Sequence, residues 1–131
     1  MFAASNIQYE LADRAGGVAC GGIGLMHMLA RQTGLIDALD ENLDLLKIHQ
    51  PYHESDHVLN LAYNILSGGT CIEDLELLRN NADYLNALDA DRIPDPTTAG
   101  DFCRRFAAED VETLLRFAKV MERLPRRGRQ F

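Results

Sequence analysis

The sequence predicts a single all-helical domain, on three observations. Apolar residues recur at a spacing of three or four along most of the chain. No run of alternating β-branched residues is long enough to form a sheet. Hydrophobic residues make up 47% of the 131 positions, enough for one core in a chain of single-domain length. We expect one compact multi-helix domain over residues 1–124, followed by a disordered basic tail over residues 125–131.

The N-terminal third is expected to contain an extended arm and two helices. Ile7, Tyr9 and Leu11 alternate with polar residues, which suits a short extended arm. A helical pattern begins at Ile23 and stops at Gly34, a good C-terminal cap. A second helix is expected over residues 35–46. The side chains expected to face the core are Ile23, Met26, Leu29 and Ala30 in the first helix and Leu35, Ile36, Leu39, Leu43 and Leu46 in the second.

The middle of the chain is expected to form three further helical segments. Pro51 disfavours helix just before it, so the next helix should start near Ser55 and end at the glycine pair 68–69. A fourth helix is expected over residues 72–80, followed by a short helical turn over 84–88. The expected core residues of these two helices are Val58, Leu59, Ala62, Ile65 and Leu66, then Ile72, Leu75 and Leu78.

The C-terminal part should hold a loop and two helices. Residues 89–96 carry two prolines and four charges, so they should form a loop. Asp95 followed by Pro96 is a strong helix start and predicts a helix over residues 96–106. A last helix is expected over residues 109–124. Inward-facing residues are expected to be Phe102, Cys103 and Phe106, then Val111, Leu114, Leu115, Ala118 and Met121.

The cysteines and the hydropathy of the chain indicate the cellular compartment of the protein. Cys20, Cys71 and Cys103 are odd in number and far apart, which suits a reducing cytoplasm and predicts small core residues. No apolar run approaches the ~20 residues needed to span a bilayer, and the N-terminus does not resemble a secretory signal. We expect a cytoplasmic protein with no membrane partner.

Charge is distributed unevenly along the chain. Residues 1–100 contain 5 basic and 15 acidic residues, whereas residues 101–131 contain 8 basic and 5 acidic ones. DNA phosphates are attracted to a local cluster of basic side chains, so the overall charge of −7 does not exclude DNA binding. Residues 72–106 predict an irregular helix-turn-helix-like segment with 96–106 as its recognition helix. The expected DNA-binding residues are Thr97, Thr98, Arg104 and Arg105; the alternative is a packing helix with two solvated arginines.

Residues 53–57 (HESDH) match the HExxH pattern of zinc peptidases. The natural N-cap is Ser55 or Asp56, which would place His53 outside the helix and remove the required geometry. No later histidine completes a three-ligand site. A polar helix start with two surface histidines is therefore expected, with no metal, no cofactor and no catalytic residue. The glycines at 21, 22 and 24 lack a phosphate-loop pattern and should permit close helix packing instead.

Three stretches carry a family resemblance: residues 51–60 (PYHESDHVLN), residues 68–74 (GGTCIED) and residues 95–102 (DPTTAGDF). Together, over about residues 2–121, the chain resembles the N-terminal region of bacterial insertion-sequence transposases of the DDE superfamily, group one.

The resemblance implies a helical domain that engages transposon-end DNA and helps assemble the transposition complex. In that family the domain precedes a ribonuclease-H-like core with three metal-binding acidic residues. None of those acids maps onto this chain, which implies a truncated, non-enzymatic fragment. Its expected partners are transposon ends and, in mixed assemblies, a second copy of the chain or full-length transposase. The alternative from another class is an acidic protein–protein module that forms homo-oligomers or inhibits full-length transposase, and a zinc peptidase is a distant third.

Overall fold

A computed structural model describes residues 11, 13, 16–18 and 20–123. The expected arm at Ile7 and Tyr9 and the expected tail over 125–131 lie outside these residues. All regular secondary structure among the described residues is helical, as predicted. Its elements are α1 (Ile23–Gln32), α2 (Leu35–Asn42), α3 (Glu54–Leu66), the 3₁₀ turn η1 (Ile72–Asp74), α4 (Leu75–Arg79), α5 (Ala82–Ala87), α6 (Pro96–Cys103) and α7 (Ala108–Arg123).

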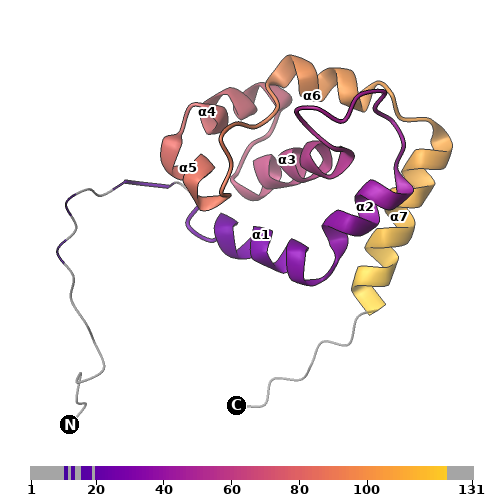
Figure 1. The fold of residues 1–131 in the computed structure, drawn as a ribbon, viewed down its shortest axis with the longest axis horizontal. Coiled ribbons are helices and arrows are strands. Elements are labelled where there is room, and N and C mark those ends of the chain that lie inside the picture. Colours follow the sequence, from indigo (N-terminus) through magenta and orange to yellow (C-terminus); the bar gives the residue numbers. More distant parts are fainter. Residues whose placement is uncertain (1–10, 12, 14–15, 19, 124–131) are drawn as a thin grey trace, which may run out of the picture.

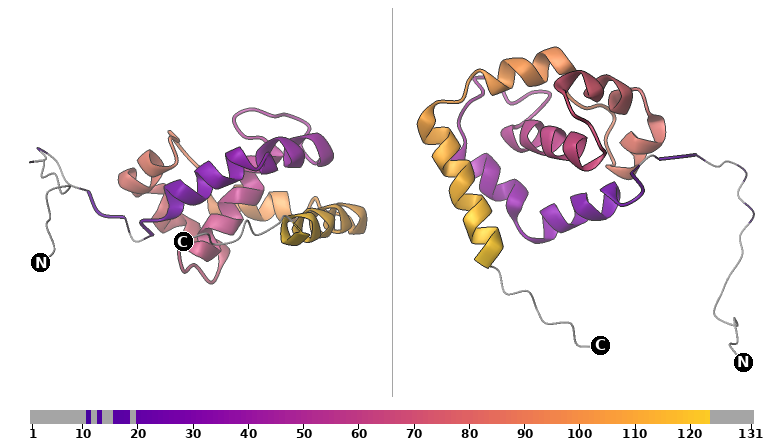
Figure 2. Two further views of the ribbon diagram at one scale, coloured as in Figure 1. Left: turned by 90° about the horizontal axis from the view of Figure 1, so that it is seen from below. Right: turned by 180° about the vertical axis from the view of Figure 1, so that it is seen from behind.

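Helix α3 runs through the middle of the molecule, and the other helices form a ring around it (Figure 1). Helices α1 and α2 lie on one side of α3, whereas α4, α5 and α6 lie on the other (Figure 1). The same ring is seen from behind, with α7 at its periphery (Figure 2). No helix among the described residues is both long enough and apolar enough to cross a membrane.

The main core joins α1, α3, α5 and the loop that follows α5. Its buried members are Ile23, Ala30, Leu59, Tyr63, Tyr84, Leu88 and Ile93. Gly24 permits close contact between α1 and α5, since a Cβ atom at this position would lie 2.9 Å from the carbonyl oxygen of Ala87. The expectation that glycines near the start of α1 allow close helix packing is therefore confirmed at Gly24 and wrong at Gly21 and Gly22, where an added Cβ would meet nothing within 4 Å.

Polar residues occupy much of the buried face of α3. Its buried residues include Glu54, Ser55, His57, Asn60 and Asn64. Ile65 is 71% exposed and Leu66 is also exposed, so the apolar stripe predicted for this helix is wrong at its C-terminal end.

The buried polar side chains of α3 bind groups from neighbouring segments. Asn60 donates to the carbonyl of Pro94 at 3.1 Å, and Asn64 donates to the carbonyl of Cys71 at 2.8 Å. Asp40 of α2 accepts from the backbone N–H of Ser55 at 2.8 Å and from its hydroxyl at 3.0 Å. These bonds satisfy part of the buried polar surface of α3, whereas Nδ1 of His57 and the Oδ1 atoms of Asn60 and Asn64 are buried without a hydrogen-bond partner among the described residues.

Helix boundaries follow the predicted signals with two shortfalls. Gly34 adopts φ +75° between α1 and α2, and Asp95 caps α6 with Pro96 as its first residue, both as predicted. The helix predicted over 35–46 ends at Asn42, because Leu43 turns to extended backbone. The helix predicted over 96–106 ends at Cys103. The segment predicted over 72–80 divides into η1 and α4, and the short helical turn predicted over 84–88 is present as α5, between α4 and α6.

Several predicted core positions are exposed instead. Met26 and Leu29 of α1 face outward, because this helix buries mainly the side that carries Ile23 and Ala30. Val111 and Leu115 are exposed because α7 lies at the edge of the ring. Ala118 is also exposed, whereas Leu114 is half-buried. The side chain of Met121 is outside the part of the chain that the structure describes. Cys71 and Cys103 are exposed, so the core role predicted for the cysteines is wrong at both positions.

Candidate functional site

Helix α6 is the candidate nucleic-acid interface, and its N-terminus is held by a tight cap. The carboxylate of Asp95 accepts from the backbone N–H of Thr98 at 2.9 Å and from its hydroxyl at 2.9 Å. These bonds lower the pKa of Asp95 below its ordinary value. The hydroxyl of Thr98 is thus engaged within the protein, whereas Thr97 is exposed at the helix start. Of the two threonines, Thr97 has the freer side chain for an external partner.

Aromatic packing fixes α6 to the central helix. Phe102 is fully buried and its ring stacks on that of His57, with centroids 4.4 Å apart and planes 11° apart. Phe106 packs edge-on against Phe102 at 5.2 Å. Burial lowers the pKa of His57 despite the opposing influence of nearby carboxylates, so the imidazole is favoured in its neutral form. The packing contact that holds α6 on α3 is therefore rigid and largely apolar.

Arg104 and Arg105 stand at the opposite end of α6 from the threonines. Arg104 donates to the carboxylate of Asp101 at 2.6 Å, and Arg105 donates to the backbone carbonyl of Leu45 at 3.2 Å. Both arginines are exposed, as predicted. An eight-residue helix is about 12 Å long, so the four predicted residues form two pairs separated by roughly that length.

Two other arginines, Arg79 and Arg116, pair with carboxylates within their own helices. Arg79 lies 3.3 Å from Glu76, and Arg116 lies 3.8 Å from Glu112. Exposed pairs of this kind contribute at most about 1 kcal/mol. The guanidinium groups can therefore exchange these carboxylates for a more strongly charged partner at little cost.

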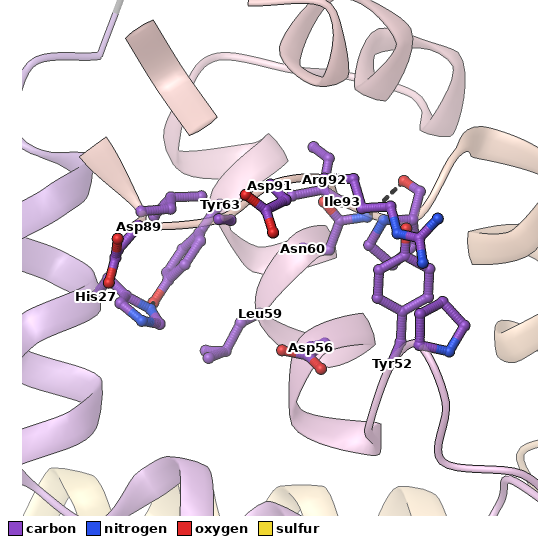
Figure 3. A pocket seen from close by; sticks show the side chains of 14 residues that line it. His27, Tyr52, Asp56, Leu59, Asn60, Tyr63, Asp89, Asp91, Arg92 and Ile93 are labelled. Atoms are coloured by element: carbon purple, nitrogen blue, oxygen red, sulfur yellow. Dashed lines mark hydrogen bonds between the residues drawn. The ribbon is translucent and has the colours of Figure 1, made fainter. Parts of the chain in front are cut away.

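A cavity of about 420 Å³ lies between α1, α3 and the loop after α5 (Figure 3). On one side Nδ1 of His27 and the hydroxyl of Tyr63 are 3.1 Å apart. On another, the guanidinium of Arg92 lies 6.0 Å from the ring centroid of Tyr52. The remaining charged lining residues are Asp56, Asp89 and Asp91. Sequence reasoning did not find this cavity, because its walls come from segments far apart in the chain.

The HExxH stretch does not form a zinc-peptidase site. His53 lies outside α3, as predicted, but it is itself the N-cap residue, so the prediction of Ser55 or Asp56 as the N-cap is wrong. Asp56 accepts from the backbone N–H of His53 at 2.9 Å. His57 is buried against Phe102, so the prediction of two surface histidines is wrong for His57. The ring of His53 stacks instead on that of His49, with centroids 5.6 Å apart.

Glu54 connects the loop after α2 to the start of α3. Its Oε1 accepts from the backbone N–H groups of Leu45 at 3.1 Å and Leu46 at 3.0 Å, and its Oε2 lies 3.1 Å from Nδ1 of His49. Burial alone would raise the pKa of Glu54, but these hydrogen bonds and the neighbouring imidazole outweigh burial and lower it. The side chain is 1% exposed and is therefore a buried carboxylate with its partners in place.

Comparison of the chain with family models, curated proteins and solved structures found no match.

Proposed function

We propose that this chain is the helical N-terminal domain of a DDE-superfamily transposase, which binds transposon-end DNA through α6 and helps assemble the transposition complex. The supporting observation is the arrangement of α6: a capped helix start with an exposed Thr97, and two exposed arginines at the far end. The exposed hydroxyl of Thr97 can contact a phosphate oxygen or a base edge, and guanidinium groups pair with phosphate in two-pronged contacts. In this proposal strand cleavage belongs to a separate core, and the domain itself supplies recognition.

Rigid mounting supports the same proposal. Phe102 fixes α6 on α3, and the Asp95 cap defines where the helix begins. A recognition element held in this way loses little conformational freedom on binding, which favours affinity. Arg104 would exchange its exposed carboxylate partner, Asp101, for a phosphate.

The test is binding of the purified chain to labelled end sequences of the parent element and to a scrambled duplex, over a range of salt concentrations. The expected result is preference for the end sequence, with affinity that falls as salt rises. Combining Arg104→Ala with Arg105→Ala should reduce the salt slope by about 1–2, one unit for each lost phosphate contact. Thr97→Ala should reduce the preference for the end sequence.

The matched control is Arg31→Ala, which removes the same charge from an exposed position on α1, across α3 from α6. This variant should bind as the unmodified chain does. Equal binding to both duplexes at low salt, or equal losses in the control and the α6 variants, would contradict recognition through α6.

A second candidate function, protein–protein association, is favoured by the surface of α7. Val111 is 48% exposed and Leu115 is 55% exposed, one helical turn apart on the same face. Burying exposed apolar side chains drives association between proteins. Substituting both with aspartate should abolish self-association in sedimentation velocity if this face joins two copies. Unchanged sedimentation across a wide concentration range would remove self-association through this face.

A further inference from the structure

Three potential metal ligands converge where the loop after α2 meets α3. His49 lies in the loop, His53 is the N-cap residue and Glu54 is the first residue of the helix. Each offers one ligand atom, and these atoms all lie within 4.8 Å of one another. The two histidines are exposed and the glutamate is buried, so the group faces solvent on one side and protein on the other.

The set of donors suits a borderline transition-metal ion. Two imidazole nitrogens and one carboxylate oxygen are a ligand combination that Zn²⁺ uses, with water in a fourth position. Bonds of about 2.1 Å in a tetrahedron place neighbouring ligand atoms about 3.4 Å apart. Drawing the three groups together therefore requires movements of about 1 Å, which exposed imidazole rings can make by rotating about their side-chain bonds.

The buried carboxylate is already oriented for this role. Its Oε1 is held by the amides of Leu45 and Leu46, whereas its Oε2 faces His49. Hydrogen bonds to the non-ligating atom fix a metal ligand in place and raise the affinity of the site. An ion at Oε2 would take the place of the contact between His49 and Glu54, which lies at a half-exposed histidine.

We propose that His49, His53 and Glu54 bind a divalent transition-metal ion such as Zn²⁺, which fastens the loop after α2 to the start of α3. The site differs from an HExxH centre, because His57 faces the core and the third ligand comes from the preceding loop. The fastened loop includes Leu45, whose carbonyl accepts from Arg105. The ion would therefore stabilise the segment that holds one end of the α6 surface. The site stands whether or not α6 binds DNA.

The experiment is calorimetric titration of Zn²⁺ into the full chain, prepared without a histidine tag and first stripped with a chelator. A parallel titration with Co²⁺ follows the visible absorption that tetrahedral nitrogen and oxygen ligation gives. One ion per chain is expected, and Zn²⁺ should raise the thermal midpoint in a concentration-dependent way. His49→Gln and His53→Gln should each weaken binding by at least about tenfold.

His27→Gln is the matched control, because it removes an imidazole outside the cluster and keeps a polar group beside Tyr63. This variant should bind Zn²⁺ with unchanged affinity. Far-UV circular dichroism in chelator verifies that all three variants fold, so a loss of binding reports a lost ligand. The proposal is overturned by the absence of saturable binding, or by affinities that His49→Gln and His53→Gln leave unchanged.

Discussion

Replacing Glu54 with alanine is expected to destabilise the fold more than most single substitutions. The change leaves the amides of Leu45 and Leu46 without their acceptor and removes the contact with His49. An amide that loses a buried acceptor costs about 1–3 kcal/mol, and these two are partly buried, so together they account for about 2–3 kcal/mol. The half-exposed contact with His49 adds at most about 1 kcal/mol. The expected loss in the free energy of unfolding is therefore about 3 kcal/mol.

Glu54→Gln separates the acceptor role from the charge. The amide side chain keeps one carbonyl oxygen for the two backbone N–H groups, so only the charge-assisted part of those bonds is lost. The expected loss is about 1 kcal/mol, a third of that for alanine. Urea unfolding followed by far-UV circular dichroism, with chelator present, measures both values.

Glu41→Ala, an exposed acid on α2, is the control for loss of one negative charge and should change stability by less than about 0.5 kcal/mol. The reasoning fails if Glu54→Ala is as stable as the unmodified chain. It also fails if glutamine and alanine destabilise equally, because the acceptor would then contribute nothing.

Three further predictions follow from the described contacts. Gly24→Ala should destabilise the fold by about 1–2 kcal/mol in urea unfolding, because the new methyl group meets the backbone of Ala87. Gly100→Ala has space around the new methyl group and should stabilise the fold by about 0.5–1 kcal/mol. A change of the same sign in both variants would contradict the close approach at Gly24. His57→Phe should flatten the decline of stability as pH falls below the ordinary pKa of 6.5, since the folded pKa of His57 is lowered and the unfolded chain takes up the proton first; an unchanged profile would show that His57 does not contribute. Asp95→Ala should cost about 1 kcal/mol through loss of the cap on Thr98. Because the folded pKa of Asp95 is lowered, this difference should be full above its ordinary value of 3.8 and shrink as pH falls through the lower folded value, as paired thermal melts would show.

Local signals in the sequence predicted the fold class and most helix starts. Asp95-Pro96 marks the start of α6, and Gly34 separates α1 from α2, because capping and left-handed backbone depend on the residue itself. The end of α2 was not predictable in this way. Leu43 is apolar and in phase with the helix, yet the chain leaves the helix there and the amides that follow bind Glu54. That partner lies eight or nine residues further along the chain, beyond the reach of a periodicity argument.

The interior of α3 shows the second limit of the sequence. Apolar periodicity placed Ile65 and Leu66 inside, whereas the structure buries Asn60 and Asn64. Hydropathy accounts for the cost of burying an amide side chain, but it does not show which carbonyl groups accept hydrogen bonds from that amide. The candidate site has the same character: Arg104 and Arg105 are exposed as predicted, but the histidine cluster depends on His49, a loop residue that no motif includes. DNA recognition itself stays a prediction.

The carboxylates of Asp40 in α2 and Glu54 in α3 also have a consequence for hydrogen exchange. The amide protons of Leu45, Leu46 and Ser55 are held by side-chain oxygens of Glu54 and Asp40, and two of these amides lie outside any helix. Their exchange with solvent requires the junction between α2 and α3 to open, so all three should exchange slowly and with similar free energies of opening. The loop would then behave as part of the same cooperative unit as α3, although its backbone makes no regular structure of its own.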